Sequence, residues 1–466
     1  MSYKSLMNKT QSERINEAYK KALASQEKLN ACITLVEPSN IEEKSGKLAG
    51  MPIAIKDNVS TKGILTTAAS NILDNYVPVF DATIVTKLKE AGATTIAKAS
   101  MDELAMGGTN LTANIGPCHN PYDLDRISGG SSGGSAALVA AGVVPMAIGS
   151  DTGDSIRKPA AYCGVVGVKP SYGRISRYGV IPYASSLDHV GYFTNNVEDA
   201  ALTLEVLAGR DDKDMTSSYE AVPNYSELLN EDVNGKKILV MKDVTDATKD
   251  QNIVNAFNHV VEELKAKGAE IKEVSFDHDL MRAIFPTYFI IANAEATANH
   301  ANLDGIRFGH RVDAPSMEEI MTASRTRGFS TFIKKRFVIG SYSLFEENQE
   351  EILKKAQRVR RLIVNAIMAE LKDAYAIISI AAPTTAPKMD AKNVDTLSDE
   401  YLIAENHMVI GNFAGLPSMT IPMALVDGLP TGICISANPF AEQAMFNVAK
   451  CIETITGLKD MTKEDF

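Results

Sequence analysis

The stretch SGGSSGGSAALVAAGVVPMAIGSDTGDSIRKPAAYCGVVG, residues 128–167, has the most unusual composition in the chain. Two Gly/Ser clusters, Gly129–Ser135 and Gly149–Ser155, flank a segment of small apolar residues that is about one helix long. Glycine and serine at this density let backbone N–H groups approach one another and a bound molecule closely, because little side chain blocks them. We therefore expect the two clusters to line a single pocket.

Three interpretations of this stretch compete. A phosphate-binding loop is disfavoured, because the chain has neither G-x-x-x-x-G-K-[ST] nor a G-x-G-x-x-G set between a strand and a helix. The clusters could instead serve only as tight turns, which is the common role of these residue types. The third interpretation is a nucleophilic serine held among backbone donors that form an oxyanion hole.

A nucleophilic serine needs a base, and Lys56 is the strongest candidate. It directly follows the apolar run Met51–Ile55, so its amine should lie at the end of a buried strand. Burial disfavours the charged form and lowers the pKa of a lysine, and a neutral lysine can accept a proton from a hydroxyl. A lysine at a strand end is more often an ion-pair partner, here of Asp57. None of the seven histidines lies in a G-x-S-x-G setting, and most have polar sequence neighbours that favour solvation.

Apolar periodicity on both sides of the stretch predicts an α/β fold. The elements predicted before it are a helix over 11–29, strands Cys32–Val36 and Pro52–Ile55, a helix over 82–92 and a strand Thr94–Ala97. Those predicted after the polar residues 210–232 are strand Lys237–Met241, helix Asp250–Lys267, strand Glu270–Val274, helices within 317–372 and strands within Ala376–Ala437. No fixed-period repeat occurs, so we expect one domain, residues 1–466, with 210–280 as a strand–helix–strand excursion within it.

The composition excludes several classes of protein. The chain has 466 residues and is 45% hydrophobic, which argues against disordered, collagen-like and coiled-coil proteins. With 47 Lys+Arg against 58 Asp+Glu its net charge is -11, whereas a protein that coats nucleic acid needs a basic surplus facing the phosphates. A role beside a nucleic acid stays open if another protein chain supplies the positive surface.

Cysteine usage and the N-terminal sequence indicate the compartment. The five cysteines are widely spaced and form no C-x-x-C, so we expect neither a disulfide framework nor a metal site. This cysteine usage fits a reducing environment. The polar N-terminal segment lacks the apolar core of a signal peptide. The longest apolar stretch, residues 135–148, is too short to span a bilayer. We therefore predict a soluble, cytoplasmic protein that does not act at a membrane.

Lys56 together with the two clusters, through Arg157, resembles the amidase signature family. The resemblance implies an α/β fold with a large mixed β-sheet covered by helices on both faces. It also implies a Ser–Ser–Lys triad that hydrolyses amides, with Ser155 as nucleophile, Ser131 in a cis peptide as bridging serine and Lys56 as general base. The backbone N–H groups from Thr152 through Gly153 and Asp154 to Ser155 would bind the oxyanion.

Within that family, the chain is most similar to the glutamine-hydrolysing subunits of tRNA-dependent amidotransferases. The similar segments are Met101–Gly107, Ser176–Gly179, Ser185–Asp188, Asp304–Gly309, Pro383–Pro387 and Ala414–Pro417. The resemblance implies that Arg336 holds the α-carboxylate of glutamine, that Glu405 holds its α-amine, and that Tyr288 lines the same pocket. An Arg fork suits a carboxylate, although a surface role for Arg336 in a basic helical turn is equally open.

The same resemblance implies a heterotrimer. A B subunit would bind tRNA and ATP with Mg²⁺, receive the ammonia and amidate Glu-tRNA(Gln) or Asp-tRNA(Asn), and a small C subunit would complete the complex. This chain would hold no cofactor of its own and would meet the tRNA mainly through its partner. Two other hypotheses stay open: a stand-alone amidase that acts on another small amide, and a catalytically impaired scaffold subunit.

The scaffold hypothesis comes from departures from the family pattern. The chain has Asp154 where the family has glycine before the nucleophile, Lys158 where glutamine is common and Glu405 where aspartate is usual. A Cβ at residue 154 would strain a backbone that needs positive φ, and a carboxylate near the oxyanion would oppose catalysis. A pairing of Asp154 with Arg157 or with Lys158, which lies at i+4, would avoid this conflict. We favour the paired arrangement.

Overall fold

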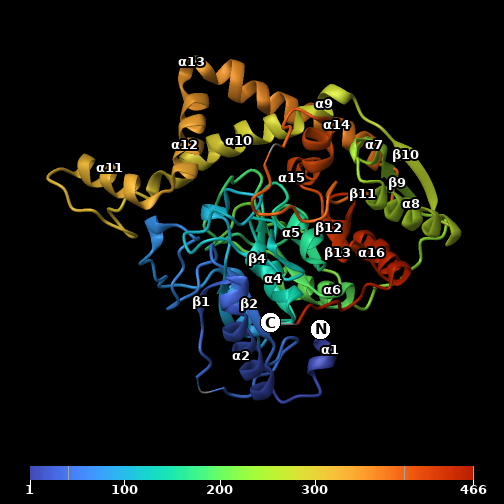
Figure 1. Ribbon diagram of the computed structural model, residues 1–466, viewed down its shortest axis with the longest axis horizontal. Coiled ribbons are helices and arrows are strands. Elements are labelled where there is room, and N and C mark those ends of the chain that lie inside the picture. The colour runs from blue at the N-terminus through green and yellow to red at the C-terminus, as the bar shows by residue number, and fades with distance from the viewer. Residues whose placement is uncertain (40, 393, 465–466) are drawn as a thin grey trace.

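A mixed sheet of 11 strands forms the centre of the computed structural model, which describes residues 1–39, 41–392 and 394–464 (Figure 1). The strand order is β1-β3-β2-β6-β8-β7-β12-β13-β11-β9-β10. The strands are β1 Cys32–Leu35, β2 Pro52–Lys56, β3 Thr94–Ala99, β6 Met146–Asp151, β7 Val166–Lys169, β8 His189–Thr194, β9 Lys237–Met241, β10 Glu270–Val274, β11 Ala376–Ile380, β12 Ser418–Val426 and β13 Leu429–Ser436. A separate pair consists of β4 His119–Asn120 and β5 Asp123–Ile127. The predicted α/β fold with a large mixed sheet is confirmed.

Helices cover both faces of this sheet. They are α1 Tyr3–Leu6, α2 Gln11–Leu29, α3 Thr83–Glu90, α4 Gly133–Ala140, α5 Arg157–Cys163, α6 Val197–Leu207, α7 Lys242–Ala247, α8 Gln251–Ala266, α9 His278–Arg282, α10 Ile284–Asn299, α11 Met317–Gly328, α12 Thr331–Leu344, α13 Glu346–Asn348, α14 Lys355–Leu371, α15 Val409–Phe413 and α16 Glu442–Thr456. Short 3₁₀ turns are η1 Asn71–Leu73, η2 Glu103–Ala105 and η3 His300–Asn302, and π-helical turns are η4 Gln349–Lys354 and η5 Glu400–Glu405.

The alternation of side chains along β2 explains the two layers. Ile53 and Ile55 belong to one buried cluster, which includes side chains of α3, α6, α8 and α16. Ala54, between them, belongs to a second cluster formed with α2, α4 and part of α5. Successive side chains of a strand point to opposite faces, so a fully apolar strand needs cover on both. Lys56 ends this buried strand.

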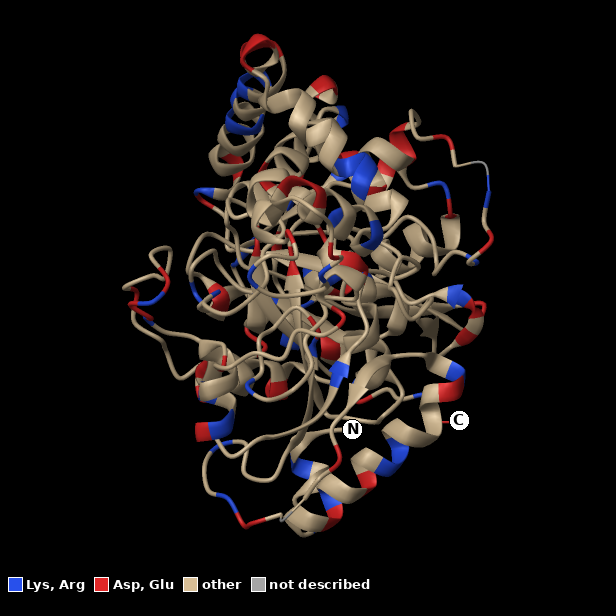
Figure 2. Ribbon diagram, turned by 90° about the vertical axis from the view of Figure 1, so that its left-hand side faces the viewer, with Lys and Arg blue, Asp and Glu red and all other residues tan. Residues whose placement is uncertain are grey.

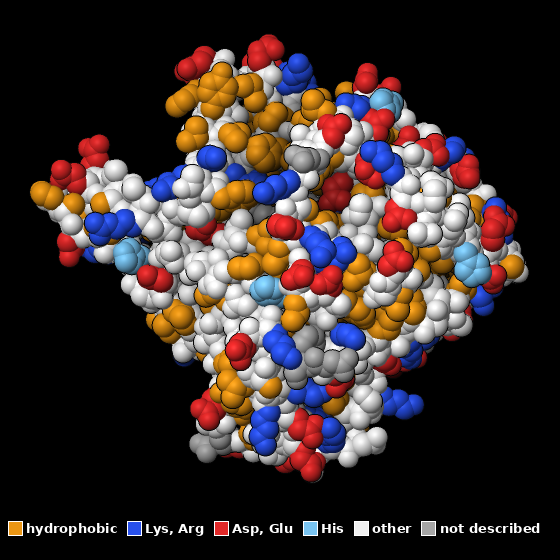
Figure 3. Space-filling model, viewed as in Figure 1, with side chains coloured by type: hydrophobic (Ala, Val, Ile, Leu, Met, Phe, Trp, Pro, Cys, Tyr) orange, Lys and Arg blue, Asp and Glu red, His pale blue; other side chains and the backbone are white. Residues whose placement is uncertain are grey.

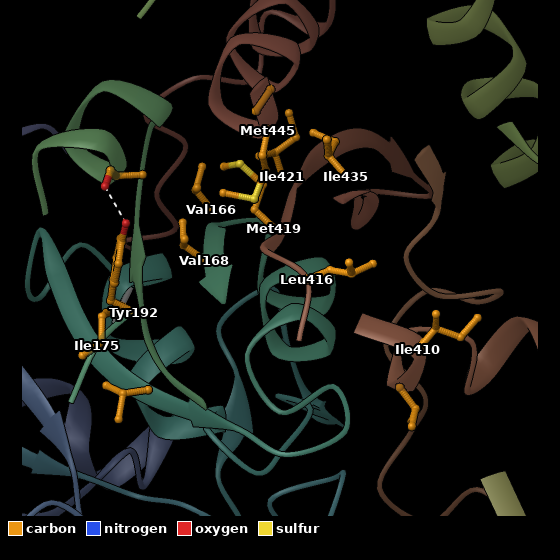
Figure 4. Close-up of a cluster of buried hydrophobic side chains, with 14 of the residues drawn as sticks. Val166, Val168, Ile175, Tyr192, Ile410, Leu416, Met419, Ile421, Ile435 and Met445 are labelled. Atoms are coloured by element: carbon orange, nitrogen blue, oxygen red, sulfur yellow. Dashed lines mark hydrogen bonds between the residues drawn. The ribbon is translucent and has the colours of Figure 1, made fainter. Parts of the chain in front are cut away.

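The core on the C-terminal side of the sheet is built in the same way. Figure 4 shows side chains of β7, β12, β13 and α16 packed together, with Met419, Ile421 and Met445 near the centre. Each fully buried side chain of this size contributes roughly 1.5–3 kcal/mol. Tyr192 lies at the edge of the same cluster, and its hydroxyl donates to the carbonyl oxygen of Ala200 at 2.6 Å.

The strand–helix–strand unit predicted from periodicity is present. β9 and β10 have the predicted bounds, pair in parallel and extend the sheet beyond β11. The helix between them, α8, begins after its N-cap Asp250, whose side chain accepts from the backbone N–H of Asn252. Its buried residues are Ile253, Phe257, Val260, Val261 and Leu264, which lie on the apolar face that the spacing predicts; Val254 of that face is only partly buried.

The segment 376–437 contains fewer strands than its composition predicts. Strand β11 ends at Ile380, and β12 begins only at Ser418. Between them the chain forms η5 and α15, which carry Glu405 and Asn412. Side chains of these two elements bond to the region around residues 151–158, so tertiary contacts override the local strand preference here.

The surface carries both signs of charge, dispersed over the side that Figure 2 shows. An exposed apolar patch lies on α12, which runs into the arm that projects from the body in Figure 1. Val338, Tyr342 and Phe345 of this patch are 69%, 56% and 55% exposed. Val338 and Tyr342 lie on one face of α12 at i, i+4, and Phe345 directly follows the helix as its C-cap; apolar atoms gather in this part of Figure 3. Within the described ranges, no helix is long and apolar enough to cross a membrane.

Candidate active site

Lys56 lies fully buried among three serines at the end of β2. Its Nζ is 2.8 Å from the Oγ of Ser131, 2.7 Å from the Oγ of Ser132 and 3.0 Å from the Oγ of Ser150. Asp57, the ion-pair partner considered from the sequence, contacts Lys98 at 3.4 Å instead. The apolar run before Lys56 therefore leads its amine into a cluster of hydroxyl groups.

The hydrogen bonds around Lys56 assign its donors. The hydroxyl of Ser132 donates to the carbonyl oxygen of Ser150 at 3.0 Å, so its oxygen accepts from Lys56. The Oγ of Ser150 accepts from Asn58 Nδ2 at 3.1 Å and from Lys56. A neutral amine has two N–H groups and one lone pair. In that state Lys56 can donate to Ser132 and to Ser150, whose carbonyl oxygen also lies 3.3 Å away, and accept from the hydroxyl of Ser131.

The surroundings favour the neutral amine. Burial lowers the pKa of Lys56 to about 7, although the carboxylates of Asp102, Asp151 and Asp188 act at longer range to raise it. At neutral pH, a large fraction of Lys56 can therefore act as a base.

The loop after β6 is held by Asp151. Its Oδ2 accepts from the backbone N–H of Ile156 at 3.0 Å and from Arg157 Nε at 3.1 Å. Its Oδ1 accepts from Arg157 Nη2 at 2.9 Å and from Asn412 Nδ2 at 2.8 Å. Burial alone would raise the pKa of Asp151, but the Arg157 guanidinium holds this pKa well below its usual range. This buried ion pair fixes both ends of the loop.

The loop leaves a row of backbone donors free. In the part of the chain that the structure describes, no group accepts a hydrogen bond from the N–H of Thr152, Gly153, Asp154 or Ser155. Arg157 Nη2 binds the carbonyl oxygen of Gly153 at 2.7 Å. Asp154 is not among the described residues with positive φ, so its Cβ causes no strain of that kind. Free, adjacent N–H groups are the donors that an oxyanion needs.

The two Gly/Ser clusters meet at this loop. The backbone N–H of Ser132 donates to the carbonyl oxygen of Ser155 at 3.2 Å, and the peptide bond between Gly130 and Ser131 is cis. A Cβ on Gly130 would lie 2.0 Å from the Oδ2 of Asp102, so only glycine fits there. Ser155 is 4% exposed, and among the described residues its Oγ has no hydrogen-bond partner, including Ser131. Bonds between catalytic groups often tighten only when substrate is bound.

Asp154 pairs with Lys158, as the i+4 spacing predicts, at 3.3 Å. The same Nζ contacts the Oε1 of Glu405 at 2.7 Å and its carbonyl oxygen at 2.5 Å. Arg157, the other partner considered, binds Asp151 instead. Lys158 thus contacts both of the other departures from the family pattern, Asp154 and Glu405.

Arg336 lies among aromatic side chains. Its Nη1 donates to the hydroxyl of Tyr183 at 3.3 Å, and its guanidinium stacks on Phe332 at 4.6 Å from the ring centre. Tyr183 meets the ring of Tyr288 edge-on, and Tyr288 packs against Gly153, where a Cβ would lie 3.0 Å from its Cζ. Arg336 and Tyr288 are thereby linked to the loop that carries Ser155.

Unpartnered donors lie beside Arg336. Its Nε is buried and has no partner within the described residues, and neither does the Nδ2 of the fully buried Asn293. Asn293 Oδ1 is 3.5 Å from Arg336 Nη1. Buried donors without acceptors are costly, so an anion at this place would relieve both groups.

A cavity of about 250 Å³ adjoins the Lys56 cluster. Its polar lining includes Asn58, Ser150, Thr152, Arg177, Tyr183 and Asp188. The hydroxyl of Thr152 donates to Asp188 Oδ1 at 2.7 Å, so the wall of the cavity is tied to the loop.

Among the described residues, no histidine contacts Lys56 or its serines, although His189 lines the adjoining cavity. His189, His300 and His407 are buried, which their polar sequence neighbours did not indicate. Burial lowers the pKa of His407 to about 3, and its Nε2 lies 2.9 Å from the Oγ of Ser379. Over the described ranges, no group of three or more His, Cys, Asp or Glu residues could hold a metal ion.

Several residues of the site could not be singled out from the sequence. The quoted stretch contains Ser132, Ser150, Asp151 and Arg157. The sequence alone does not show which of them contacts Lys56 or holds the loop and which only forms a turn. Asn58 follows Lys56 by two positions. Asn293 and Asn412 carry no local signal, because they reach the site from distant elements, whereas Asp188 lies in the family-like segment Ser185–Asp188.

Comparison with known proteins places the chain among amidases. The sequence profile of the amidase family matches residues 5–446. The A subunit of glutamyl-tRNA(Gln) amidotransferase from Lactobacillus johnsonii is 41% identical over 466 residues, which cover 97% of this chain and 96% of that protein. Its counterpart from Fusobacterium nucleatum subsp. nucleatum is 40% identical over 477 residues, with coverage of 99% and 97%. The crystal structure of the counterpart from Thermotoga maritima matches with a TM-score of 0.83, at 36% identity and coverage of 97% and 94%.

Proposed function

We propose that this chain, which belongs to the amidase family, is the glutamine-hydrolysing component of a tRNA-dependent amidotransferase. The observation that carries the chemistry is the contact of 2.8 Å between the buried Lys56 Nζ and the Ser131 Oγ. The choice of glutamine rests on the glutamyl-tRNA(Gln) amidotransferase A subunits, which resemble the chain over nearly their whole length.

In the proposed reaction, the Oγ of Ser155 attacks the carbon of the glutamine side-chain amide. Its proton passes to Ser131, whose own proton moves to the lone pair of Lys56. The oxyanion that forms accepts hydrogen bonds from the free N–H groups of residues 152–155. The carbon–nitrogen bond then breaks, and Lys56 returns the proton through Ser131 to the departing ammonia.

A glutamyl ester remains on Ser155 after ammonia has left. Water attacks this ester, with Lys56 again accepting a proton through Ser131, and glutamate leaves. The net reaction consumes glutamine and water and yields glutamate and ammonia. No redox or metal chemistry is needed for these steps.

Substrate recognition is proposed to involve the two charged ends of glutamine. The unpartnered Nε of Arg336 and Nδ2 of Asn293 support a site for the α-carboxylate, beside the ring of Tyr288. Glu405 would take part in binding the α-ammonium.

The complex is proposed to contain B and C subunits. The B subunit would bind ATP, Mg²⁺ and the charged tRNA in the cytoplasm, and would use the ammonia to amidate Glu-tRNA(Gln) or Asp-tRNA(Asn). The exposed patch of Val338, Tyr342 and Phe345 supports a protein partner, because exposed apolar faces commonly mark interaction sites. The acidic net charge of -11 fits a chain that leaves the tRNA to its partner.

The paired state of Asp154 argues against the scaffold hypothesis. Its carboxylate contacts Lys158, and its backbone N–H is free for an oxyanion. The stand-alone amidase hypothesis predicts equal or faster release of ammonia from amides that lack the amino-acid end of glutamine.

The deciding experiment measures ammonia release from L-glutamine by the purified chain, alone and with co-expressed B and C subunits. We expect hydrolysis that requires Ser155 and that increases in the complex with charged tRNA and ATP. Faster turnover of simple amides such as butyramide than of glutamine would instead support a stand-alone amidase. Absence of amide hydrolysis in the complete complex would support the scaffold.

A further inference from the structure

Lys158 is a buried cation whose contacts are all made within the protein. Its side chain is 2% exposed, and its Nζ is surrounded by the carbonyl oxygen and Oε1 of Glu405 and the Oδ2 of Asp154. Its Nζ donates to that carbonyl oxygen and forms ion pairs with both carboxylates. Lys158 therefore serves the two acids and is not exposed to a ligand.

The two acids around Lys158 keep free oxygens. The Asp154 and Glu405 side chains are 20% and 29% exposed, whereas Lys158 is buried beneath them. Lys158 contacts one carboxylate oxygen of each acid, and elsewhere in the described ranges no group donates to the other oxygen. Two carboxylates and one ammonium leave one negative charge, which a single cation would neutralise.

Two tyrosines connect the loop of Asp154 with Arg336. The ring of Tyr288 packs against Gly153, next to Asp154, and meets the ring of Tyr183 edge-on. The hydroxyl of Tyr183 accepts a hydrogen bond from Arg336, whose Nε lies buried without a partner among the described residues. The anionic pair and the unpartnered donor are therefore joined through two aromatic rings. This arrangement matches an amino acid, with its carboxylate and ammonium at opposite ends.

We propose that Asp154 and Glu405 together bind the α-ammonium of the substrate, and that Lys158 positions the two carboxylates for it. This inference rests on the proposed function and deepens it. Asp154 is then a specificity-determining residue rather than a defect in the oxyanion loop. A positioned Lys158 also explains how two acids can stay close together without a bound ligand.

The arrangement makes amine recognition sensitive to pH. Burial raises the pKa of Asp154 to about 6. Of the neighbouring charges, Lys158 and Arg157 lower this pKa, whereas Asp151 and Glu405 raise it. The neutral phenol of Tyr288 also faces it. Below pH 6 Asp154 becomes protonated, and the net negative charge of the pair is lost. The KM for a substrate with an ammonium should therefore rise as the pH falls through about 6.

The test compares L-glutamine with glutaramate, which has the same amide and carboxylate but no amine. We measure kcat and KM for both from pH 5 to 8 with the wild-type chain and Asp154→Asn. Loss of one charge-assisted hydrogen bond should raise the KM for glutamine about tenfold at pH 7.5. The KM for glutaramate should change less than about twofold. In Asp154→Asn, the rise in the KM for glutamine as the pH falls through about 6 should disappear.

Two further variants sharpen the result. In Lys158→Gln, the KM for glutamine should begin to rise at a higher pH than in the wild type, because Lys158 no longer lowers the pKa of Asp154. Glu400→Gln is the matched control, since Glu400 lies on the same π-helical turn as Glu405 but pairs with Lys249 at the surface. It should leave both substrates unaffected.

Distinct outcomes separate this inference from the proposed function. If Asp154→Asn impairs glutamine and glutaramate equally, or impairs neither, Asp154 does not bind the amine and the inference is wrong. Calorimetry with Ser155→Ala, which cannot turn substrate over, measures the dissociation constants of glutamine and glutaramate. These constants allow the same comparison of the two substrates. If that protein does not bind glutamine and the wild type hydrolyses only simple amides, the proposed function itself fails.

Discussion

The Nζ of Lys56 lies 2.8 Å from the Oγ of Ser131, and no carboxylate of the described chain lies within ion-pair distance of it. Other buried lysines are placed differently. Lys98 contacts Asp57 at 3.4 Å, and Lys158 contacts Glu405 at 2.7 Å. Lys169 donates to the backbone carbonyl oxygens of Gly411 and Leu416 and contacts no hydroxyl group among the described residues. A lysine paired with an acid stays protonated, whereas one surrounded by hydroxyl groups can lose its proton at moderate cost. This contrast supports the proposal that Lys56 is the base.

The state of Lys56 predicts the pH dependence of the reaction. Because burial lowers the pKa of Lys56 to about 7, the amine is protonated and inactive as a base at lower pH. We expect kcat/KM for glutaramate to rise about tenfold per pH unit up to about pH 7 and to level off above it. Glutaramate is used because it lacks the amine that Asp154 is proposed to bind. A flat profile between pH 5.5 and 8.5 would argue against Lys56.

Replacement of the proposed nucleophile should abolish turnover. We expect Ser155→Ala to lower kcat for glutamine by at least about 10⁴-fold, as loss of a nucleophile does in other hydrolases. Ser135→Ala is the control, because Ser135 is equally buried but donates only to the carbonyl oxygen of Ile148. It should cost about 1 kcal/mol of stability and leave kcat intact. Full activity of Ser155→Ala would place the nucleophile elsewhere.

The ion pair beneath the loop should be essential for stability. Asp151→Asn leaves the buried guanidinium of Arg157 without its counter-charge, and breaking a buried pair costs roughly 3–5 kcal/mol. Urea unfolding measures this loss. The control Glu262→Gln removes an exposed pair with Lys265 and should leave the unfolding midpoint unchanged. Equal midpoints for the two variants would contradict the role assigned to Asp151.

Close packing predicts that Gly130 cannot be replaced. In Gly130→Ala the new Cβ would meet the Oδ2 of Asp102, which also accepts from the backbone N–H of Asn110 at 2.9 Å. We expect a loss of about 1–3 kcal/mol in stability together with most of the activity. Gly108→Ala is the matched control, because a Cβ there meets no atom within 4 Å. Thermal unfolding and the glutaminase assay distinguish the two variants.

The patch on α12 should matter for assembly but not for hydrolysis. We expect Val338→Asp with Tyr342→Asp to reduce co-purification of the B and C subunits several-fold, because charges would be buried at an apolar contact. Glutamine hydrolysis by the isolated chain should not change. Val79→Asp, at a site that is 83% exposed, is the control. Undiminished co-purification of the patch variant would show that the partners bind elsewhere.

Patterns within a few residues of each other were readable from the sequence. The apolar run before Lys56 predicted a buried strand that ends at this residue, and β2 ends there. The periodicity of residues 250–267 predicted α8 and its buried face. The i+4 spacing of Asp154 and Lys158 predicted their ion pair. Local spacing sets side-chain direction in helices and strands, so these features do not depend on the rest of the fold.

Only the tertiary structure decided which distant groups complete the site. Lys158 and Glu405 are 247 positions apart, and Asp151 and Asn412 are 261 positions apart, yet each pair is in contact. These contacts exist because β7 pairs with β12, which brings the C-terminal third of the chain over the loop. No local pattern encodes the order of strands in a sheet. The sequence by itself therefore predicted the candidate base, the Gly/Ser loops and the local ion pair, whereas long-range strand pairing decided what surrounds Asp154.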